Sequence, residues 1–295
     1  NMKNIKKVLF ILYFVIVVLL KFSQKIGYFD EIWNFNMARN FLYGNLPYRN
    51  FNMIIFPAFP FILSVLLKIF GNQFLVYRIF QIFLCVIALK LSWKIIDKFD
   101  QENNIFLYFV NWVYFLFLVC NNIIEYNFFS LVLVEWVVLL EFSKNNYRNR
   151  FLIGVLLGIL ILTKQTIGIS VVFFSITSIF FTSDKNKFKK IITEILGIIF
   201  PLIFLIIYIF SNSIQNEFVD YTFFSGSDFL TNGKNFLKFL GMSEIIICFI
   251  ILIITIAFFI QTKKDENKIK LFLYAFSMLS VSFPIVDNSH LSISL

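Results

Sequence analysis

Charged residues are scarce in this sequence. Aspartate, glutamate, lysine and arginine make up 15% of the 295 residues, whereas hydrophobic residues make up 59%. A soluble domain has no core large enough to bury that proportion of apolar side chains. Apolar runs long enough to cross a bilayer recur along the whole chain, which indicates that lipid is the solvent. The composition therefore excludes an ordinary soluble protein and predicts an all-α membrane protein.

Cysteine and histidine are also rare. Cys85, Cys120 and Cys248 lie in apolar segments without a motif spacing, so we interpret them as small core residues and predict no disulfide. The single histidine, His290, has no cysteine on its predicted side of the membrane, which excludes an ordinary structural zinc site.

The net charge of +9 does not predict a nucleic-acid partner, because the basic residues lie in short loops between apolar segments. A role in membrane orientation explains them better. The 43 phenylalanines, with many isoleucines, asparagines and lysines, suggest an A/T-biased coding sequence. That bias makes any single lysine or asparagine weak evidence for function.

Most of the apolar segments are clear candidates for membrane spans, but two are ambiguous. Residues 56–70 are short and contain two prolines, whereas residues 151–182 are too long for one crossing and are divided by Lys164. The clear segments are residues 8–20, 74–93, 105–120, 128–142, 191–210, 244–261 and 271–286.

Loop charge settles both ambiguous segments. If residues 56–70 lie on the outer surface and residues 151–182 form a hairpin turning at Lys164, all basic clusters fall on one side. We therefore predict a multi-pass cell-membrane protein of about nine transmembrane helices, with a cytoplasmic N-terminus and an outer-surface, juxtamembrane helical first loop. We expect one membrane-embedded domain over residues 1–295, truncated at its C-terminus. The clusters are Lys3, Lys6 and Lys7; Lys94 and Lys98; Lys144, Arg148 and Arg150; Lys185, Lys187, Lys189 and Lys190; and Lys263, Lys264, Lys268 and Lys270.

The first outer loop contains an acidic pair, Asp30 and Glu31. Asp30 suits the start of a helix, Gly44 suits the position after its end, and Pro47 prevents continuation. We expect a helix that lies in the membrane interface. The acidic pair is either a functional site or a cap that complements the helix dipole.

Three further charged residues are candidates. Glu125 is the only acid in the second outer loop and, taken alone, suits a solvated loop charge. Glu135 lies inside a predicted span, where a structural carboxylic acid bonded to a neighbouring helix is favoured over a functional one. Lys164 follows two glycines, Gly154 and Gly158, that allow close helix packing. Either an anionic partner holds this lysine at the outer surface, or it snorkels there.

Oxygen ligands for a divalent cation are available on the same predicted face. Asp30, Glu31, Glu125 and Asp287 suit Mg²⁺, Mn²⁺ or Ca²⁺, although the pattern leaves the metal open.

The order of these motifs resembles the GT-C class of polytopic glycosyltransferases, specifically the protein O-mannosyltransferase group (glycosyltransferase family 39) and the aminoarabinose transferases. Asp30-Glu31, followed by Arg39 and Gly44-x-x-Pro47-Tyr48, is similar to the first-loop acidic motif of that class. Glu125 matches the position of its second-loop acid. The remaining matches are Pro57 to Pro60 before Ile69-Phe70-Gly71, Arg78, and Leu162-Thr163-Lys164.

The resemblance implies sugar transfer from a polyprenyl-phosphate donor to a glycan, lipid or protein hydroxyl on the extracytoplasmic face. Asp30 would be the base, with Glu31 or Glu125 orienting the acceptor or sharing a Mg²⁺ or Mn²⁺ ion. Lys164 would contact the donor phosphate, and Arg78, His290 and Asp287 are further candidates for substrate binding. Two other readings stay open: a transporter or lipid flippase, and a noncatalytic subunit that only binds a partner.

Overall fold

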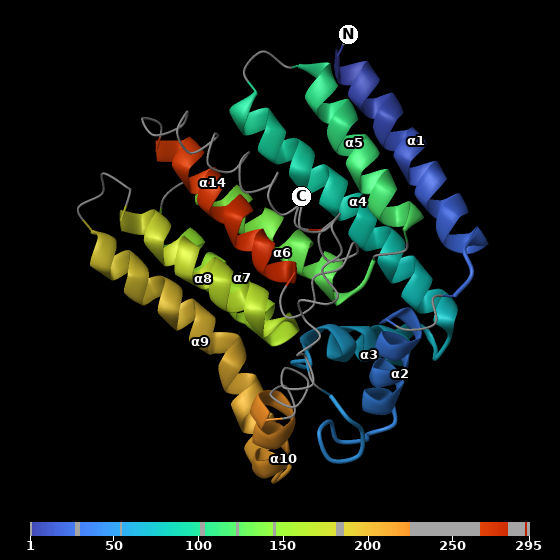
Figure 1. Cartoon of the computed structure of the whole chain (residues 1–295), viewed down its shortest axis with the longest axis vertical. Coiled ribbons are helices and arrows are strands. Elements are labelled where there is room, and N and C mark those ends of the chain that lie inside the picture. The colour runs from blue at the N-terminus through green and yellow to red at the C-terminus, as the bar shows by residue number, and fades with distance from the viewer. Residues whose placement is uncertain are drawn as a thin grey trace, which may run out of the picture.

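The computed structural model describes residues 2–26, 30–53, 55–100, 104–121, 124–143, 146–180, 186–224, 266–282 and 293. Within these ranges the chain is helical and contains no β-strand, apart from an isolated bridge between Pro47 and Phe51. The all-α prediction is therefore confirmed (Figure 1). The α-helices are α1 (Met2–Ser23), α2 (Asp30–Leu42), α3 (Ala58–Phe70), α4 (Phe74–Phe99), α5 (Ile105–Cys120), α6 (Tyr126–Glu141), α7 (Tyr147–Thr163), α8 (Gln165–Phe180), α9 (Lys187–Ser211), α10 (Gln215–Val219) and α14 (Glu266–Met278). A π-helix (Asp220–Phe224) follows α10, and a 3-10 turn (Leu279–Ser282) follows α14.

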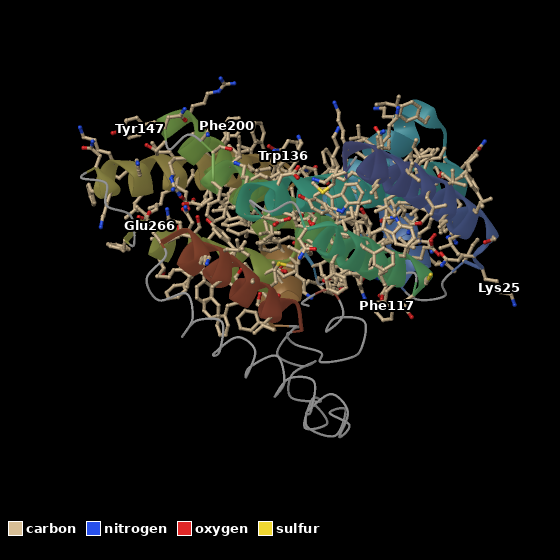
Figure 2. The ribbon with its side chains drawn as sticks, turned by 90° about the horizontal axis from the view of Figure 1, so that it is seen from above. Lys25, Phe117, Trp136, Tyr147, Phe200 and Glu266 are labelled. Carbon is tan, nitrogen blue, oxygen red and sulfur yellow. The ribbon has the colours of Figure 1, made fainter. Side chains whose placement is uncertain are left out.

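Two helices of the described part of the chain, α4 and α9, are long and apolar enough to span a membrane, with 26 and 25 residues. Helices α5 and α8 are apolar but shorter. Figure 2 shows the exposed aromatic side chains of Phe117, Trp136, Tyr147 and Phe200 around the outside of the helices. This arrangement suits a helical membrane protein, because lipid and not water is the favourable solvent for such side chains. The number of spans stays a prediction.

Several helix boundaries follow the predicted segments. Helix α5 covers residues 105–120, as predicted, and residues 8–20 and 74–93 lie within α1 and α4. Residues 244–261 lie outside the described residues.

The predicted break at Lys164 is confirmed. Helix α7 ends at Thr163, α8 begins at Gln165, and Lys164 has an extended backbone with φ −146° and ψ 112°. The two helices form a hairpin, because Ser175 of α8 donates a hydrogen bond of 2.7 Å to Glu194, whose carboxylate also contacts Arg150 near the start of α7.

Helix α7 packs tightly against α9. A Cβ atom on Gly154 would collide with the carbonyl oxygen of Glu194, and one on Gly158 would collide with the ring of Pro201. The prediction that these glycines permit close packing is therefore confirmed. Helix α9 carries Pro201 in its interior and bends part-way along its length (Figure 1).

Contacts show which helix ends lie together. Lys6 of α1 pairs with Asp97 of α4 at 2.7 Å. Lys98 of α4 donates a hydrogen bond of 2.8 Å to the carbonyl of Phe142, directly after α6. We call this end, which also holds the starts of α7, α9 and α14, the basic end. Helices α2 and α3 lie at the opposite end, away from the N-terminus (Figure 1); we call it the site end.

The basic end contains a buried ion network. Arg150 lies in α7 and is buried, rather than lying in the predicted loop. Its guanidinium donates two hydrogen bonds, of 2.6 and 2.7 Å, to Glu141, and Nη1 lies 3.4 Å from Glu194. Lys270 of α14 lies 3.7 Å from Glu141. The loop interpretation of Arg150 is wrong because these carboxylates from α6 and α9 compensate its charge inside the bundle.

Candidate functional site

The acidic motif of the first loop forms the start of α2. Asp30 is its first residue and is exposed, and Glu31 is buried. The helix ends at Leu42, and Gly44 has a φ of +78°, a left-handed backbone that glycine adopts without strain. The predicted helix and its end are therefore confirmed. Acidic residues in a first turn also complement the helix dipole.

Glu31 is bound to Arg78 of α4. The distance between Arg78 Nη2 and Glu31 Oε2 is 3.1 Å, and each residue is 4% exposed. The same nitrogen donates to the carbonyl of Lys25 at 3.2 Å, which ties the end of α1 to this pair. Such a pair persists away from water only when both charges stay compensated. Arg78 thus fixes the start of α2 against the bundle.

A second polar cluster joins α6 to the α7–α8 junction. Asn127 donates a hydrogen bond of 2.7 Å to Glu125, and its amide oxygen accepts one of 2.9 Å from Lys164. Glu125 and Lys164 are each 6% exposed. The interpretation of Glu125 as a solvated loop charge is therefore wrong, and so is that of Lys164 as a snorkelling lysine.

The α2–α4 pair and the second cluster belong to one end of the bundle. Arg78 and Gln81 share a face of α4, because they are three residues apart. Gln81 donates a hydrogen bond of 2.9 Å to the carbonyl of Ile124, the residue before Glu125. Aromatic rings also connect the helices, since Trp33 of α2 lies 6.3 Å from Tyr126 of α6.

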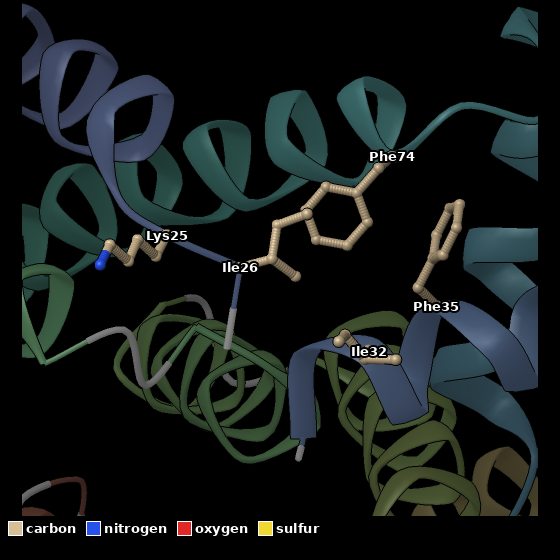
Figure 3. Close-up of a pocket in the computed structure, with 5 residues that line it drawn as sticks. All are labelled: Lys25, Ile26, Ile32, Phe35 and Phe74. Carbon is tan, nitrogen blue, oxygen red and sulfur yellow. The ribbon is translucent and has the colours of Figure 1, made fainter. Parts of the chain in front are cut away.

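An apolar pocket of about 620 Å³ lies beside α2. Its lining includes Ile26, Ile32, Phe35 and Phe74, and Figure 3 shows these four side chains grouped around it. The ammonium group of Lys25 extends away from them (Figure 3). The pocket therefore suits an apolar chain rather than a charged group, and it lies against the helix that carries Asp30.

Other candidate residues lie elsewhere. Asp287 and His290 are outside the described residues. Glu135 is buried in α6, ten residues beyond Glu125, and about 15 Å further along the helix axis. Among the described residues, no three acidic, histidine or cysteine side chains gather closely enough to hold a metal ion.

The sequence did not predict three residues of the site end, Asn127, Gln81 and Tyr126. Asn127 stands two residues after Glu125, but in an asparagine-rich chain that spacing carries little weight. Gln81 lies one turn after Arg78 within an apolar helix, and its position is a usable signal: a polar side chain inside a span needs a partner.

Comparisons with protein-family models, curated protein sequences and solved structures find no match to this chain.

Proposed function

We propose that this chain is an integral membrane glycosyltransferase that moves a sugar from a polyprenyl-phosphate donor to an acceptor hydroxyl on the extracytoplasmic face. The observation that supports this best is that the site end contains both an acidic residue and a lysine. Asp30 presents an exposed carboxylate, and Lys164 holds a buried ammonium group in a hydrogen-bonded cluster.

Glycosyl transfer needs both groups. The acceptor oxygen attacks the anomeric carbon, forms the new C–O bond and passes its proton to the carboxylate of Asp30. The bond between the anomeric carbon and the phosphate oxygen breaks, and its electron pair leaves with the phosphate. Attack opposite to the leaving group inverts the anomeric centre.

The departing phosphate needs positive charge that is already in place. The ammonium group of Lys164 is fixed by Asn127, so little reorganisation accompanies charge development. Arg78 Nη1 is a buried donor without a hydrogen-bond acceptor among the described residues, which leaves it available to an anion. The apolar pocket beside α2 suits the first part of the polyprenyl chain.

The proposed topology places the basic end in the cytoplasm. Lys6, Lys98 and Arg150 come from distant segments and meet at that end. Cytoplasmic ends of spans carry an excess of lysine and arginine. The site end then faces outward, where the acceptors of the cell envelope lie.

The substitution Asp30→Asn tests the proposal directly. In membranes supplied with a polyprenyl-phosphate sugar, we expect transfer to fall by about 10²–10⁴-fold with expression unchanged, because the base is lost. Asp100→Asn is the matched control, since Asp100 follows the opposite end of α4. Wild-type transfer by Asp30→Asn would rule out Asp30 as the base. Mass spectrometry of envelope glycans with and without the gene would name the sugar.

A transporter is the second candidate function, and Glu135 is the observation that favours it. This buried carboxylic acid lies in the interior of α6, away from the Glu125 cluster. Transporters place such groups near the middle of the membrane. Movement of a polyprenyl-phosphate sugar across proteoliposomes, abolished by Glu135→Gln but not by Asp30→Asn, would support transport over transfer.

A further inference from the structure

A groove of about 530 Å³ lies between α4 and α6 at the basic end, far from the candidate site. Its walls combine apolar side chains, Leu91, Leu139 and Leu140, with the cations Lys94 and Lys98 and the indole of Trp136. Trp136 is 47% exposed and lies along the outside of the helices (Figure 2). Tryptophan is enriched where acyl chains meet lipid headgroups.

Among the described residues, positive charge exceeds negative charge in this groove and on the adjoining face of α4. Lys90, Lys94 and Lys98 are exposed and recur every fourth residue, so they form a stripe along one face of α4. Within the described part of the chain, Lys90 and Lys94 make no hydrogen bond or ion pair. Lys98 is held at the end of α6 by the carbonyl of Phe142 at 2.8 Å.

The acid in this groove does not cancel that charge. Asp97 accepts a hydrogen bond of 2.7 Å from Lys6 and one of 2.6 Å from the hydroxyl of Tyr108. Its carboxylate is therefore compensated from the α1 and α5 side of α4. Counted over the described residues, the lysines of the stripe keep a net positive charge on the groove side.

We propose that this groove binds an anionic phospholipid of the inner leaflet. The phosphate group would lie against Lys94 and Lys98, and an acyl chain would run along Leu91, Leu139 and Trp136 toward the bilayer interior. A free phosphate ion would use the lysines alone and leave the apolar wall uncovered. Charge and apolar surface together therefore select a lipid.

Native mass spectrometry of the full chain, released from micelles containing equal phosphatidylglycerol and phosphatidylcholine, tests the proposal. We expect the wild type to retain phosphatidylglycerol preferentially. Lys94→Gln should lower that retention by about fivefold, because each lysine near an anionic headgroup adds a similar binding free energy. The double variant Lys94→Gln/Lys98→Gln should lower it further. Lys94→Gln removes no described contact, so its result does not depend on refolding of the groove. Lys68→Gln, an exposed lysine at the end of α3, is the matched control.

Any of the following outcomes would overturn the proposal. The first is equal retention of the two lipids by the wild type. The second is unchanged phosphatidylglycerol retention by the double variant, or an equal loss in Lys68→Gln. The third is complete displacement of the lipid by millimolar inorganic phosphate, which would show that the lysines bind an ion without using the apolar wall.

Discussion

The two ends of the bundle both bury charged groups, but they satisfy them differently. At the basic end, Arg150 is chelated by Glu141 and approached by Glu194, so the network closes on itself. At the site end, one buried pair, Glu31 with Arg78, is also closed, but Lys164 is hydrogen-bonded to the amide of Asn127, and Asp30 is exposed on the helix that lines an apolar pocket. The basic end is therefore organised to hold helices together, whereas the site end combines an ion pair with an exposed carboxylate and an apolar pocket, which is the arrangement that the proposed function uses.

Removing Arg150 should give the largest loss of stability. Arg150→Gln would leave Glu141 and Glu194 buried without a guanidinium, at a cost of about 3–5 kcal/mol. We expect a strong fall in the thermal midpoint of the purified protein and in its monodisperse fraction after solubilisation. Arg148→Gln is the control, because Arg148 is exposed on the same turn of α7. If the two variants were equally stable, the ion network of Arg150 would not stabilise the bundle, and the proposed difference between the two ends would fail.

Changing Lys164 should instead affect the reaction. Lys164→Gln can keep a hydrogen bond to Asn127, so we expect a cost of only about 1 kcal/mol in stability. Loss of the charge should reduce transfer by about 10²-fold and raise the KM for the donor. Steady-state assays with varied donor separate KM from kcat, with Lys68→Gln as the control. If Lys164→Gln kept the wild-type KM and kcat for the donor, Lys164 would not bind the donor phosphate, and its cluster would have only a structural role.

The contact between α7 and α9 connects the two ends, and Gly158→Ala should loosen it. The added Cβ would meet the Pro201 ring and the carbonyl of Ile198, so we expect a cost of about 1–3 kcal/mol. Thermal unfolding monitored by fluorescence measures it. Ile169→Ala on the exposed side of α8 is the control. If Gly158→Ala left the thermal midpoint unchanged, α9 would be able to move away from α7 at no cost. The contact between α7 and α9 would then not hold the two ends of the bundle together.

The helices were easier to predict than the polar contacts, for a physical reason. Apolar runs, Gly44 and the charge at Lys164 are local signals, and they located α5, the end of α2 and the α7–α8 break. The partner of Lys164 lies 37 residues away, at Asn127. Nothing in hydropathy encodes that pairing, because it depends on how helices pack.

Hydropathy also failed for the buried charges of the basic end. A charge near the edge of an apolar run is typical of a loop, so Arg150 was assigned to one. Its compensation comes from Glu141 and Glu194, on two other helices. Only the tertiary arrangement shows that these three charges meet inside the protein.

The smallest predicted effect concerns the exposed contact that fastens the first loop at the site end. The guanidinium of Arg49 lies 2.7 Å from the carboxylate of Glu217 in α10, and this hydrogen bond lowers the pKa of that carboxyl below its usual value. A carboxyl whose pKa is lower in the folded protein than in the unfolded chain stabilises the fold. This stabilisation is complete above the pKa of the unfolded chain, and it is lost as the pH falls through the pKa of the folded protein. Glu217→Gln should therefore lower the thermal midpoint slightly at pH 7, and this difference should shrink as the pH falls through the lowered pKa of Glu217. If the thermal midpoints of the wild type and Glu217→Gln differ as much at low pH as at pH 7, packing around α10 and not the ion pair holds this loop in place. The site end would then resemble the basic end, because both would depend on packed contacts.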